Sequence, residues 1–99
     1  MAQGHITPAY RGRYGVLLVD DHPMMRYGIA RILQSEPDFI VCGEADNEIS
    51  AMSSIRKTRP DIIIMDISLK GTDGITLTRT IQANYPTIPV VIVSMHDDK

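Results

Sequence analysis

Cysteine is nearly absent from this 99-residue chain, which contains only Cys42. A single cysteine excludes an internal disulfide framework and fits a reducing compartment such as the cytosol. Long apolar runs are also missing, because the longest, such as residues 62–65 and 90–93, fall far short of the roughly 18 residues that span a bilayer. No apolar stretch follows the first basic residues in the manner of a secretory signal. The sequence therefore predicts a cytoplasmic protein with no membrane segment.

Neither sign of charge is in large excess, since ten Lys and Arg stand against twelve Asp and Glu, for a net charge of −2. This balance provides no basic surface with which to hold nucleic acid. Six prolines and seven glycines are too few for a disordered or fibrous chain. An apolar fraction of 43% in 99 residues supports one core and leaves no room for a second. We therefore expect one soluble globular domain.

Two parts of the chain differ in pattern. Residues 1–13 mix Gly, Pro and polar types without a period, and we expect a flexible tail there, followed by the domain over residues 14–99. In the domain, runs of four to five apolar residues predict strands that are buried on both faces. The predicted strands are residues 15–19, 39–43, 62–65 and 90–93, and the predicted helices are residues 24–34, 48–58 and 75–84. Strands separated by helices indicate parallel β-α-β units, so the predicted class is α/β with a doubly wound sheet.

Each predicted helix has a stripe of residues that is expected to face the sheet. The stripes are Met25, Ile29, Ile32 and Leu33; Ile49, Met52 and Ile55; and Ile75, Thr78, Ile81 and Gln82. Pro23 suits the first turn of the first helix, and Arg26 is expected on its outer side. Asp46 or Asn47 is expected to cap the second helix. Cys42 is expected to be a small buried residue of the second strand.

Polar side chains follow three of the predicted strands where each one ends. Asp20 and Asp21 follow the first strand, Asp66 follows the third and Ser94 follows the fourth. Because parallel strands end at one edge of the sheet, and neighbours lie about 5 Å apart, the three carboxylates are expected to share a pocket. Carboxylates at such distances repel one another unless a cation lies between them. An all-oxygen site without clustered His or Cys favours Mg²⁺ over zinc and leaves positions open to phosphate oxygens.

Four segments taken together resemble the receiver domain of bacterial two-component response regulators. The segments are Val19–Pro23, Ile64–Asp66, Lys70–Gly74 and Val93–Ser94. The Asp-Asp-His-Pro start, with residues 43–45 and 73–75, resembles the NarL/FixJ branch, in which a LuxR-type helix-turn-helix usually follows the receiver. The resemblance covers about residues 14–98 and implies a flavodoxin-like sheet of order 2-1-3-4-5.

The resemblance implies a role for each matched residue. Asp66 is implied to be the phosphoacceptor, whose carboxylate attacks the phosphorus of a phosphohistidine on a sensor histidine kinase. Asp21 would bind Mg²⁺ directly, Asp20 directly or through water, and the backbone carbonyl of Ser68 would complete the protein ligands. Ser94 would hydrogen-bond the new phosphoryl oxygen and act as the switch. The implied function is a phosphorylation-controlled switch with a transcriptional output, rather than a turnover enzyme.

The sequence departs from the family's pattern in two places. Receivers carry a lysine and an aromatic residue on a fifth strand, whereas this chain stops at Lys99, before a fifth strand and the last helices, and Lys99 is too close to Ser94 to be that lysine. Lys70 stands where the family more often has Pro. We expect residues 90–93 to form an open edge, in a fragment of a longer protein or in a chain that pairs with itself or another partner. DNA would be contacted only through a C-terminal domain that is absent here.

Other interpretations fit parts of the same pattern. Aspartates also cap helices in solvated loops. A receiver-like interaction or dimerisation module that is not phosphorylated would keep the fold, but it has no reason to retain the full acidic set. A cobalamin-binding domain would require Gly where Met25 stands, and an aspartyl phosphatase would require Asp where His22 stands. Of the histidines, His22 is expected to be a loop residue and His96 a surface group.

Overall fold

The computed structural model describes Tyr10 and residues 12–67 and 73–93. Strands and helices alternate along the chain as β1 (Tyr14–Val19), α1 (Pro23–Gln34), β2 (Phe39–Ala45), α2 (Glu48–Thr58), β3 (Ile62–Asp66), α3 (Gly74–Asn84) and β4 (Val90–Val93). The four strands pair in parallel in the order β2-β1-β3-β4. The predicted doubly wound α/β sheet of order 2-1-3-4 is therefore confirmed, with small shifts at the ends of elements.

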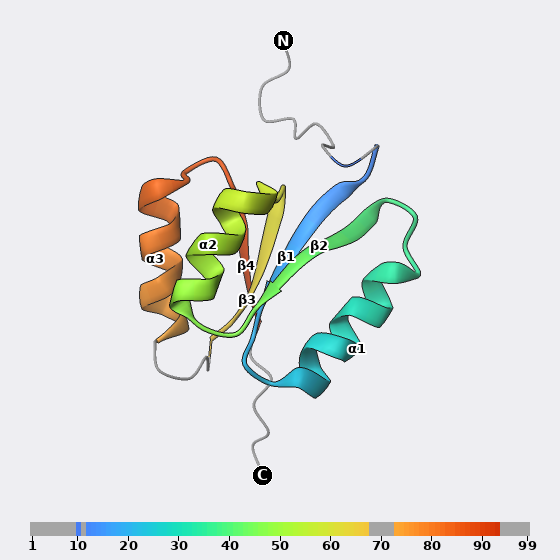
Figure 1. Cartoon of the computed structure of the whole chain (residues 1–99), viewed down its shortest axis with the longest axis horizontal. Helices are drawn as coiled ribbons and strands as arrows, with labels where there is room; N and C mark the ends of the chain where they lie inside the picture. Colours follow the sequence, from blue (N-terminus) through green and yellow to red (C-terminus); the bar gives the residue numbers. More distant parts are fainter. Residues whose placement is uncertain (1–9, 11, 68–72, 94–99) are drawn as a thin grey trace.

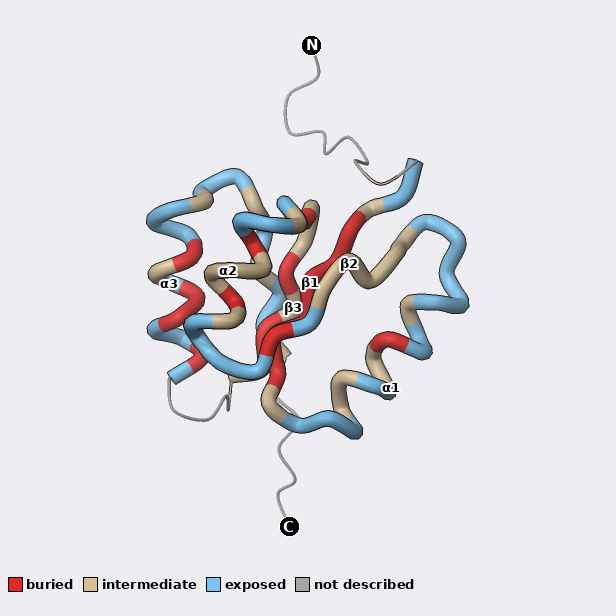
Figure 2. The backbone as a smooth tube through the Cα atoms, in the orientation of Figure 1, coloured by how far each residue is buried: buried red, intermediate tan, exposed pale blue. Residues whose placement is uncertain are grey.

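Helices cover both faces of the sheet, with α2 and α3 on one face and α1 on the other (Figure 1). Successive residues of β1 point to opposite faces, because strand side chains alternate. Leu17 and Val19 pack in the core under α2 and α3, whereas Val16 and Leu18 pack against Ala30 of α1. Figure 2 shows the consequence as a continuous buried run along β1. Unbroken apolar sequence thus corresponds to a strand with no solvent face.

The predicted inner stripes of the helices are wrong at four positions. Ile32 and Ile49 are 67% and 83% exposed, and Ile75 and Gln82 are exposed as well. Small residues take the inner positions of α1 and α2, where Ala30 and Ala51 are buried against the sheet, and Leu77 takes the corresponding place on α3. Where a helix approaches a sheet closely, only a small side chain such as that of alanine fits between the helix axis and the sheet. The largest apolar residues of the helix therefore do not mark its buried face.

Local polar contacts set the ends of two helices. Asn47 caps α2, because its side chain accepts a hydrogen bond from the Ser50 N–H at 2.8 Å while the Ser50 hydroxyl accepts one from the Asn47 N–H at 3.3 Å. This capping box resolves the choice between Asp46 and Asn47 in favour of Asn47. Asp73 caps α3 by accepting a hydrogen bond from the Ile75 N–H at 3.1 Å.

Cys42 lies at an irregular point of β2 and is only partly buried. The pairing of β1 with β2 shifts there, because Val16 pairs with Val41 while Leu17 pairs with Gly43. Cys42 is therefore the extra residue of a β-bulge and has no partner position on β1. We predicted a small buried residue, whereas Cys42 is partly buried, because the bulge takes it out of the regular strand pattern.

The predicted tail over residues 1–13 falls largely outside the described residues. Of the part that the structure describes, Tyr10 and Arg13 form an antiparallel bridge with backbone hydrogen bonds of 2.9 and 3.0 Å. The Tyr10 hydroxyl donates a hydrogen bond to the backbone carbonyl of Thr58. This segment thus contacts the end of the molecule where α2 finishes.

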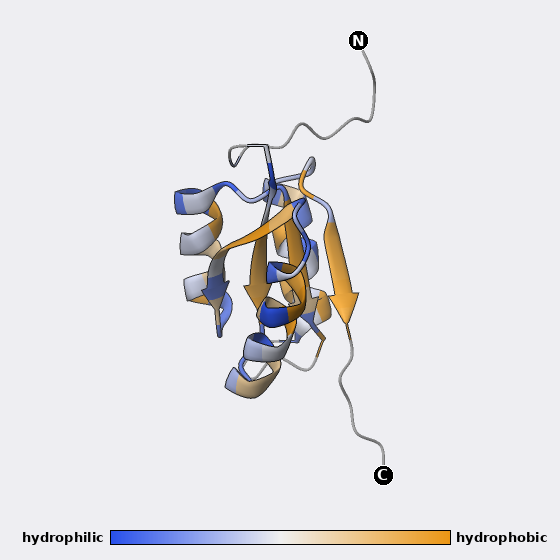
Figure 3. Cartoon of the chain, turned by 90° about the vertical axis from the view of Figure 1, so that its right-hand side faces the viewer, coloured by the Kyte–Doolittle hydropathy of each residue, from blue (hydrophilic) through white to orange (hydrophobic). Residues whose placement is uncertain are grey.

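The strand β4 lies at one edge of the described sheet, and Figure 3 shows it as a strongly hydrophobic strand on the outside of the fold. Val91 and Ile92 point to opposite faces of the sheet and are both about half exposed, at 50% and 45%. An apolar hollow lies beside β4, lined by His22, Met24, Met25, Gly28, Ile29, Ile32 and Val93. Within the described ranges, no helix combines the length and apolar character required to cross a membrane.

Candidate metal and phosphoacceptor site

Three carboxylates meet where β1 and β3 end. These strands are neighbours, with Val19 paired to Met65, so Asp20 and Asp66 are the next residues along two adjacent strands. Asp20 and Asp66 are 3% and 1% exposed, and Asp21 is partly buried. The predicted convergence of Asp20, Asp21 and Asp66 is therefore present. It follows from the parallel pairing, which brings residues more than forty positions apart to one edge.

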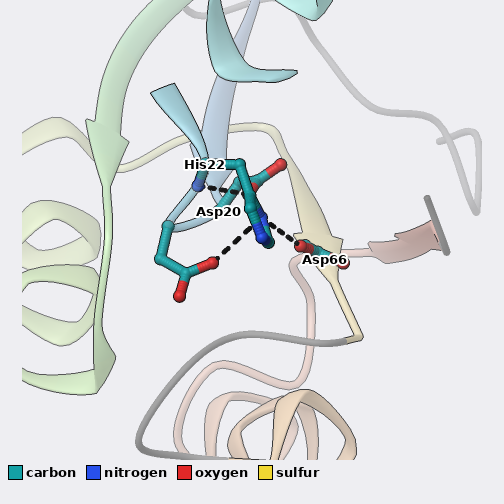
Figure 4. A group of neighbouring side chains, drawn as sticks. Asp20, His22 and Asp66 are labelled. Carbon is teal, nitrogen blue, oxygen red and sulfur yellow. Dashed lines mark hydrogen bonds and ion pairs between the residues drawn. The ribbon is translucent and has the colours of Figure 1, made fainter. Parts of the chain in front are cut away.

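His22 lies among the same three carboxylates (Figure 4). Its Nδ1 atom is 2.9 Å from Asp20 Oδ1, 3.0 Å from Asp21 Oδ1 and 3.3 Å from Asp66 Oδ2. The histidine lies in the loop, as expected, and its ring faces the acidic residues, which was not predicted from the sequence. The position before Pro23 accounts for the extended backbone of His22, but it carries no signal for the direction of the ring.

The loop that carries these residues is held by hydrogen bonds from both sides. The Asp20 carboxylate accepts a hydrogen bond from the backbone N–H of His22 at 2.8 Å. The backbone carbonyl of Asp20 accepts one from the Arg26 guanidinium at 2.6 Å, and Arg26 also pairs with Glu44 at 3.0 Å. Arg26 was expected on the outer side of α1, yet its side chain is only 20% exposed. These contacts fix the direction in which the loop leaves β1.

The charges around His22 favour its protonated form. The hydrogen bond with Asp20 is the main cause that raises the pKa of His22 above its usual value, and the charges of Asp21, Asp20 and Asp66 act in the same direction. Desolvation acts against them. The direction of the shift indicates a site with strongly negative potential that attracts positive charge.

The cluster fits a divalent cation. Asp20, Asp21, His22 and Asp66 each offer one donor atom, and these atoms lie within 4.8 Å of one another. Asp20 Oδ2 is buried and has no hydrogen-bond partner among the described residues. A buried carboxylate oxygen without a partner is costly, and a bound cation would satisfy it. The set is rich in oxygen donors, as hard cations such as Mg²⁺ require.

Two predicted site residues, Ser68 and Ser94, lie outside the described residues, as do Lys70, His96 and Lys99. Ile67 and Val93 are described, and they directly precede these two serines in the sequence. Val93 pairs with Asp66, and the Ile67 N–H donates a hydrogen bond to the Val93 carbonyl at 3.0 Å. The segments that precede the two serines are thus joined directly at the site.

The chain is similar to proteins of one family. The response regulator receiver domain family matches residues 16–99. The transcriptional regulatory protein DegU of Brevibacillus brevis is 36% identical over 84 residues, which cover 85% of this chain and 36% of DegU. A crystal structure of a LuxR-family two-component response regulator from Aurantimonas sp. shows a TM-score of 0.79 at 36% identity, covering 86% of this chain and 61% of that one.

A more distant neighbour is RcsB from Salmonella enterica serovar Typhimurium, solved bound to a promoter in the presence of the phosphomimetic BeF₃⁻. It shows a TM-score of 0.78 at 28% identity, covering 85% of this chain and 42% of RcsB. The chain spans 36% of the length of DegU, so it corresponds to one part of that longer relative. The family match covers most of the chain and agrees with the sheet order and the acidic cluster. The chain therefore belongs to the response regulator receiver domains, in their NarL/FixJ branch.

Proposed function

We propose that Asp66 accepts a phosphoryl group from a sensor histidine kinase, in a reaction that requires Mg²⁺. Asp20, Asp21, Asp66 and the backbone carbonyl of Ser68 would hold the ion. The observation that carries this proposal is the burial of Asp66 at the end of β3, with its carboxylate in one cluster with Asp20 and Asp21. A structural carboxylate has no need of two further acidic groups beside it, because their mutual repulsion destabilises the fold.

The proposed chemistry is a phosphoryl transfer between two nucleophiles. An Asp66 carboxylate oxygen attacks the phosphorus, the P–N bond of the phosphohistidine breaks, and the departing imidazole keeps the electron pair and takes up a proton. The product on Asp66 is an acyl phosphate. Bound Mg²⁺ supplies positive charge against the phosphoryl oxygens. The burial of Asp66 and Asp20 keeps bulk water from the reacting carboxylate.

The proposed outcome is a change of conformation rather than turnover. Ser94 would hydrogen-bond the new phosphoryl oxygen and so move the segment that follows β4. We place this switch in the cytoplasm, upstream of a DNA-binding output domain that lies outside this chain. The support is that DegU is a transcriptional regulatory protein and that RcsB was solved on a promoter. With a net charge of −2, the present residues provide no basic surface for that output.

We propose in addition that the β4 edge pairs with a second copy of the chain. Val91 and Ile92 expose apolar surface on both faces of this strand, and none of the other described strands pairs with its outer side. Exposed strand edges of this kind attract further strands. Pairing would cover Val91, Ile92 and part of the apolar hollow beside α1.

The phosphoacceptor is tested by incubating the chain with acetyl phosphate and Mg²⁺ and measuring its intact mass. We expect wild type to gain one phosphoryl group and Asp66→Asn to gain none, and we expect chelation of Mg²⁺ to abolish the gain. Asp38→Asn is the matched control, because Asp38 is exposed and lies directly before β2. It is therefore at the end of the sheet where the strands begin, opposite the acidic cluster. This control should label like wild type.

Equal labelling of wild type and Asp66→Asn would remove Asp66 from the acceptor role. A wild-type chain that remains unlabelled under all conditions would instead favour the interaction module, which keeps the fold without the reaction. A gain of more than one phosphoryl group in Asp38→Asn and wild type alike would contradict the assignment of a single acceptor.

A further inference from the structure

The imidazole of His22 is a nitrogen donor within an otherwise all-oxygen cluster. Its Nδ1 lies 2.9, 3.0 and 3.3 Å from one oxygen each of Asp20, Asp21 and Asp66. Cation ligands at about 2.1 Å in an octahedral arrangement place neighbouring donor atoms about 3 Å apart. The distance from Nδ1 to Asp20 Oδ1 is that of a hydrogen bond in the ion-free site, and the spacing of the nitrogen from the three oxygens also equals that of donors that share one ion.

The backbone holds the ring in this place. His22 is the residue before α1, with φ −107° and ψ 105°, and Pro23 disfavours a helical conformation at this position. The Asp20 carboxylate accepts a hydrogen bond from the His22 N–H at 2.8 Å, which closes the turn between the two residues. Proline and a buried aspartate thus set the backbone turn, and the hydrogen bond between His22 Nδ1 and Asp20 Oδ1 at 2.9 Å holds the ring toward the cluster before an ion binds.

The chemistry of the two donor types differs. A bound cation would displace the proton that His22 Nδ1 shares with Asp20 in the ion-free site, and imidazole with its remaining proton on Nε2 then presents a lone pair at Nδ1. Mg²⁺ prefers oxygen ligands and retains water, whereas imidazole nitrogen suits the later first-row divalent ions, whose affinities rise from Mn²⁺ through Co²⁺ to Ni²⁺. A histidine in this position therefore changes which ion the cluster binds best.

We propose that His22 is a direct ligand of the bound cation through Nδ1 and gives the site a preference for Mn²⁺ and Co²⁺ over Mg²⁺. This inference rests on the proposed function, because it takes Asp20, Asp21 and Asp66 as the metal site. The buried Asp20 Oδ2, which has no hydrogen-bond partner among the described residues, supports an ion at this place independently of His22.

Binding constants for Mg²⁺, Mn²⁺ and Co²⁺ test the preference in wild type and His22→Phe, which keeps an aromatic ring without the nitrogen. We expect the dissociation constant of Co²⁺ to rise at least about tenfold, that of Mn²⁺ to rise less, and that of Mg²⁺ to change by less than about threefold because water replaces the nitrogen. His22→Ala repeats the measurement should His22→Phe fail to fold. An equal rise in the dissociation constants of the three ions would overturn the proposal, because His22 would then give no preference among them. Tighter binding of all three ions by the variant would also overturn it, because the ring would then compete with the cation for its position.

Pulsed electron paramagnetic resonance of bound Mn²⁺ tests the ligand directly. The chain contains three histidines, so replacing His5 and His96 by Asn leaves His22 as its only imidazole. We expect a nitrogen coupling to Mn²⁺ in this chain and its loss on adding His22→Phe. Absence of the coupling would overturn the proposal.

Labelling of Asp66 separates this inference from the proposed function. Phosphoryl gain with Mg²⁺ in both wild type and His22→Phe, without nitrogen coupling, rejects the role of His22 alone and leaves Asp66 as acceptor. A chain that binds none of the three ions and gains no phosphoryl group rejects both.

Discussion

At the scale of single residues, the site depends on where Asp20 points. This aspartate is buried, its Oδ1 accepts the N–H of His22, and its backbone carbonyl accepts a hydrogen bond from Arg26. Arg26 in turn pairs with Glu44 at the end of β2. One arginine thus joins α1, the loop after β1 and the neighbouring strand, and it carries positive charge to the border of an acidic cluster.

We expect Arg26→Met to lower the free energy of unfolding by about 1–2 kcal/mol, because a charge-assisted hydrogen bond to a buried carbonyl is lost. Arg31→Met on the same helix is the control. Arg31 is exposed and contacts Tyr27, so its replacement should change the free energy by less than about 0.5 kcal/mol. Urea denaturation measures both. Equal effects of the two substitutions would show that the Arg26 contact has no special role.

The position of His22 could not be deduced from residue types. The pattern Asp-Asp-His-Pro predicted a loop, and the carboxylates of Asp20, Asp21 and Asp66 were brought together by strand pairing alone. Whether the ring turns toward them depends on one side-chain torsion and on the turn that Asp20 and Pro23 impose, and neither is visible in composition or periodicity. The acidic residues were therefore predictable from the sequence, whereas their nitrogen neighbour was not.

At the scale of elements, the close approach of α3 to the end of β3 constrains the backbone at Asp66. A Cβ atom at Gly74 would lie 2.6 Å from the backbone oxygen of Asp66 and 2.8 Å from the Cα atom of Ile67. The Gly74 N–H also donates a hydrogen bond to the Ile67 carbonyl at 3.3 Å. The first turn of α3 therefore rests directly on the backbone of the proposed phosphoacceptor, and only glycine allows this distance.

We expect Gly74→Ala to destabilise the fold by about 1–3 kcal/mol, as overpacking against rigid backbone does, and to slow phosphoryl gain on Asp66. Gly28→Ala on α1 is the matched control, because a Cβ there meets no atom within 4 Å. That change should stabilise the fold by about 0.5–1 kcal/mol through helix propensity. Thermal denaturation and intact mass give the two readouts. A Gly74→Ala chain as stable and reactive as wild type would disprove the contact.

Sequence periodicity located the helices and part of their buried faces, since Ile55, Thr78 and Ile81 are buried as expected. The strands were identifiable because their apolar runs are unbroken, and Pro23 marked the start of the first helix while Asp46 or Asn47 marked the start of the second. The predicted buried faces were wrong at Ile32, Ile49 and Ile75, where large apolar side chains are exposed while alanines lie against the sheet. Periodicity records which residues are apolar, whereas the distance between helix and sheet decides which of them fit beneath the axis.

At the scale of the whole molecule, the two ends of the strands differ in their contacts, and the two lateral strands of the sheet differ in their exposed surface. Tyr10 and Thr58 meet at the end where the strands of the sheet begin, and the acidic cluster lies where they finish. Laterally, β2 lies at one edge of the described sheet and β4 at the other. Among the strands that the structure describes, only β4 exposes large apolar side chains on both of its faces, at Val91 and Ile92.

The proposed pairing at this edge predicts association that depends on concentration. We expect size-exclusion chromatography with light scattering to show dimers of wild type, and a shift toward monomer in the double variant Val91→Thr, Ile92→Thr, because less apolar surface is removed from water. Ile49→Thr is the control, since Ile49 is the same residue type as Ile92 and is even more exposed but lies on α2. A wild-type monomer at all concentrations, or an equal response of the control, would exclude pairing through β4.

The hydrogen bond between the Ile67 N–H and the Val93 carbonyl joins the peptide after the proposed acceptor to the last described residue of β4. The bond couples the backbone beside Asp66 to the edge strand of the described sheet without an intervening side chain. A displacement of this backbone would therefore act on β4 through the peptide group of Val93. An isotope label on the Val93 carbonyl would report such a displacement.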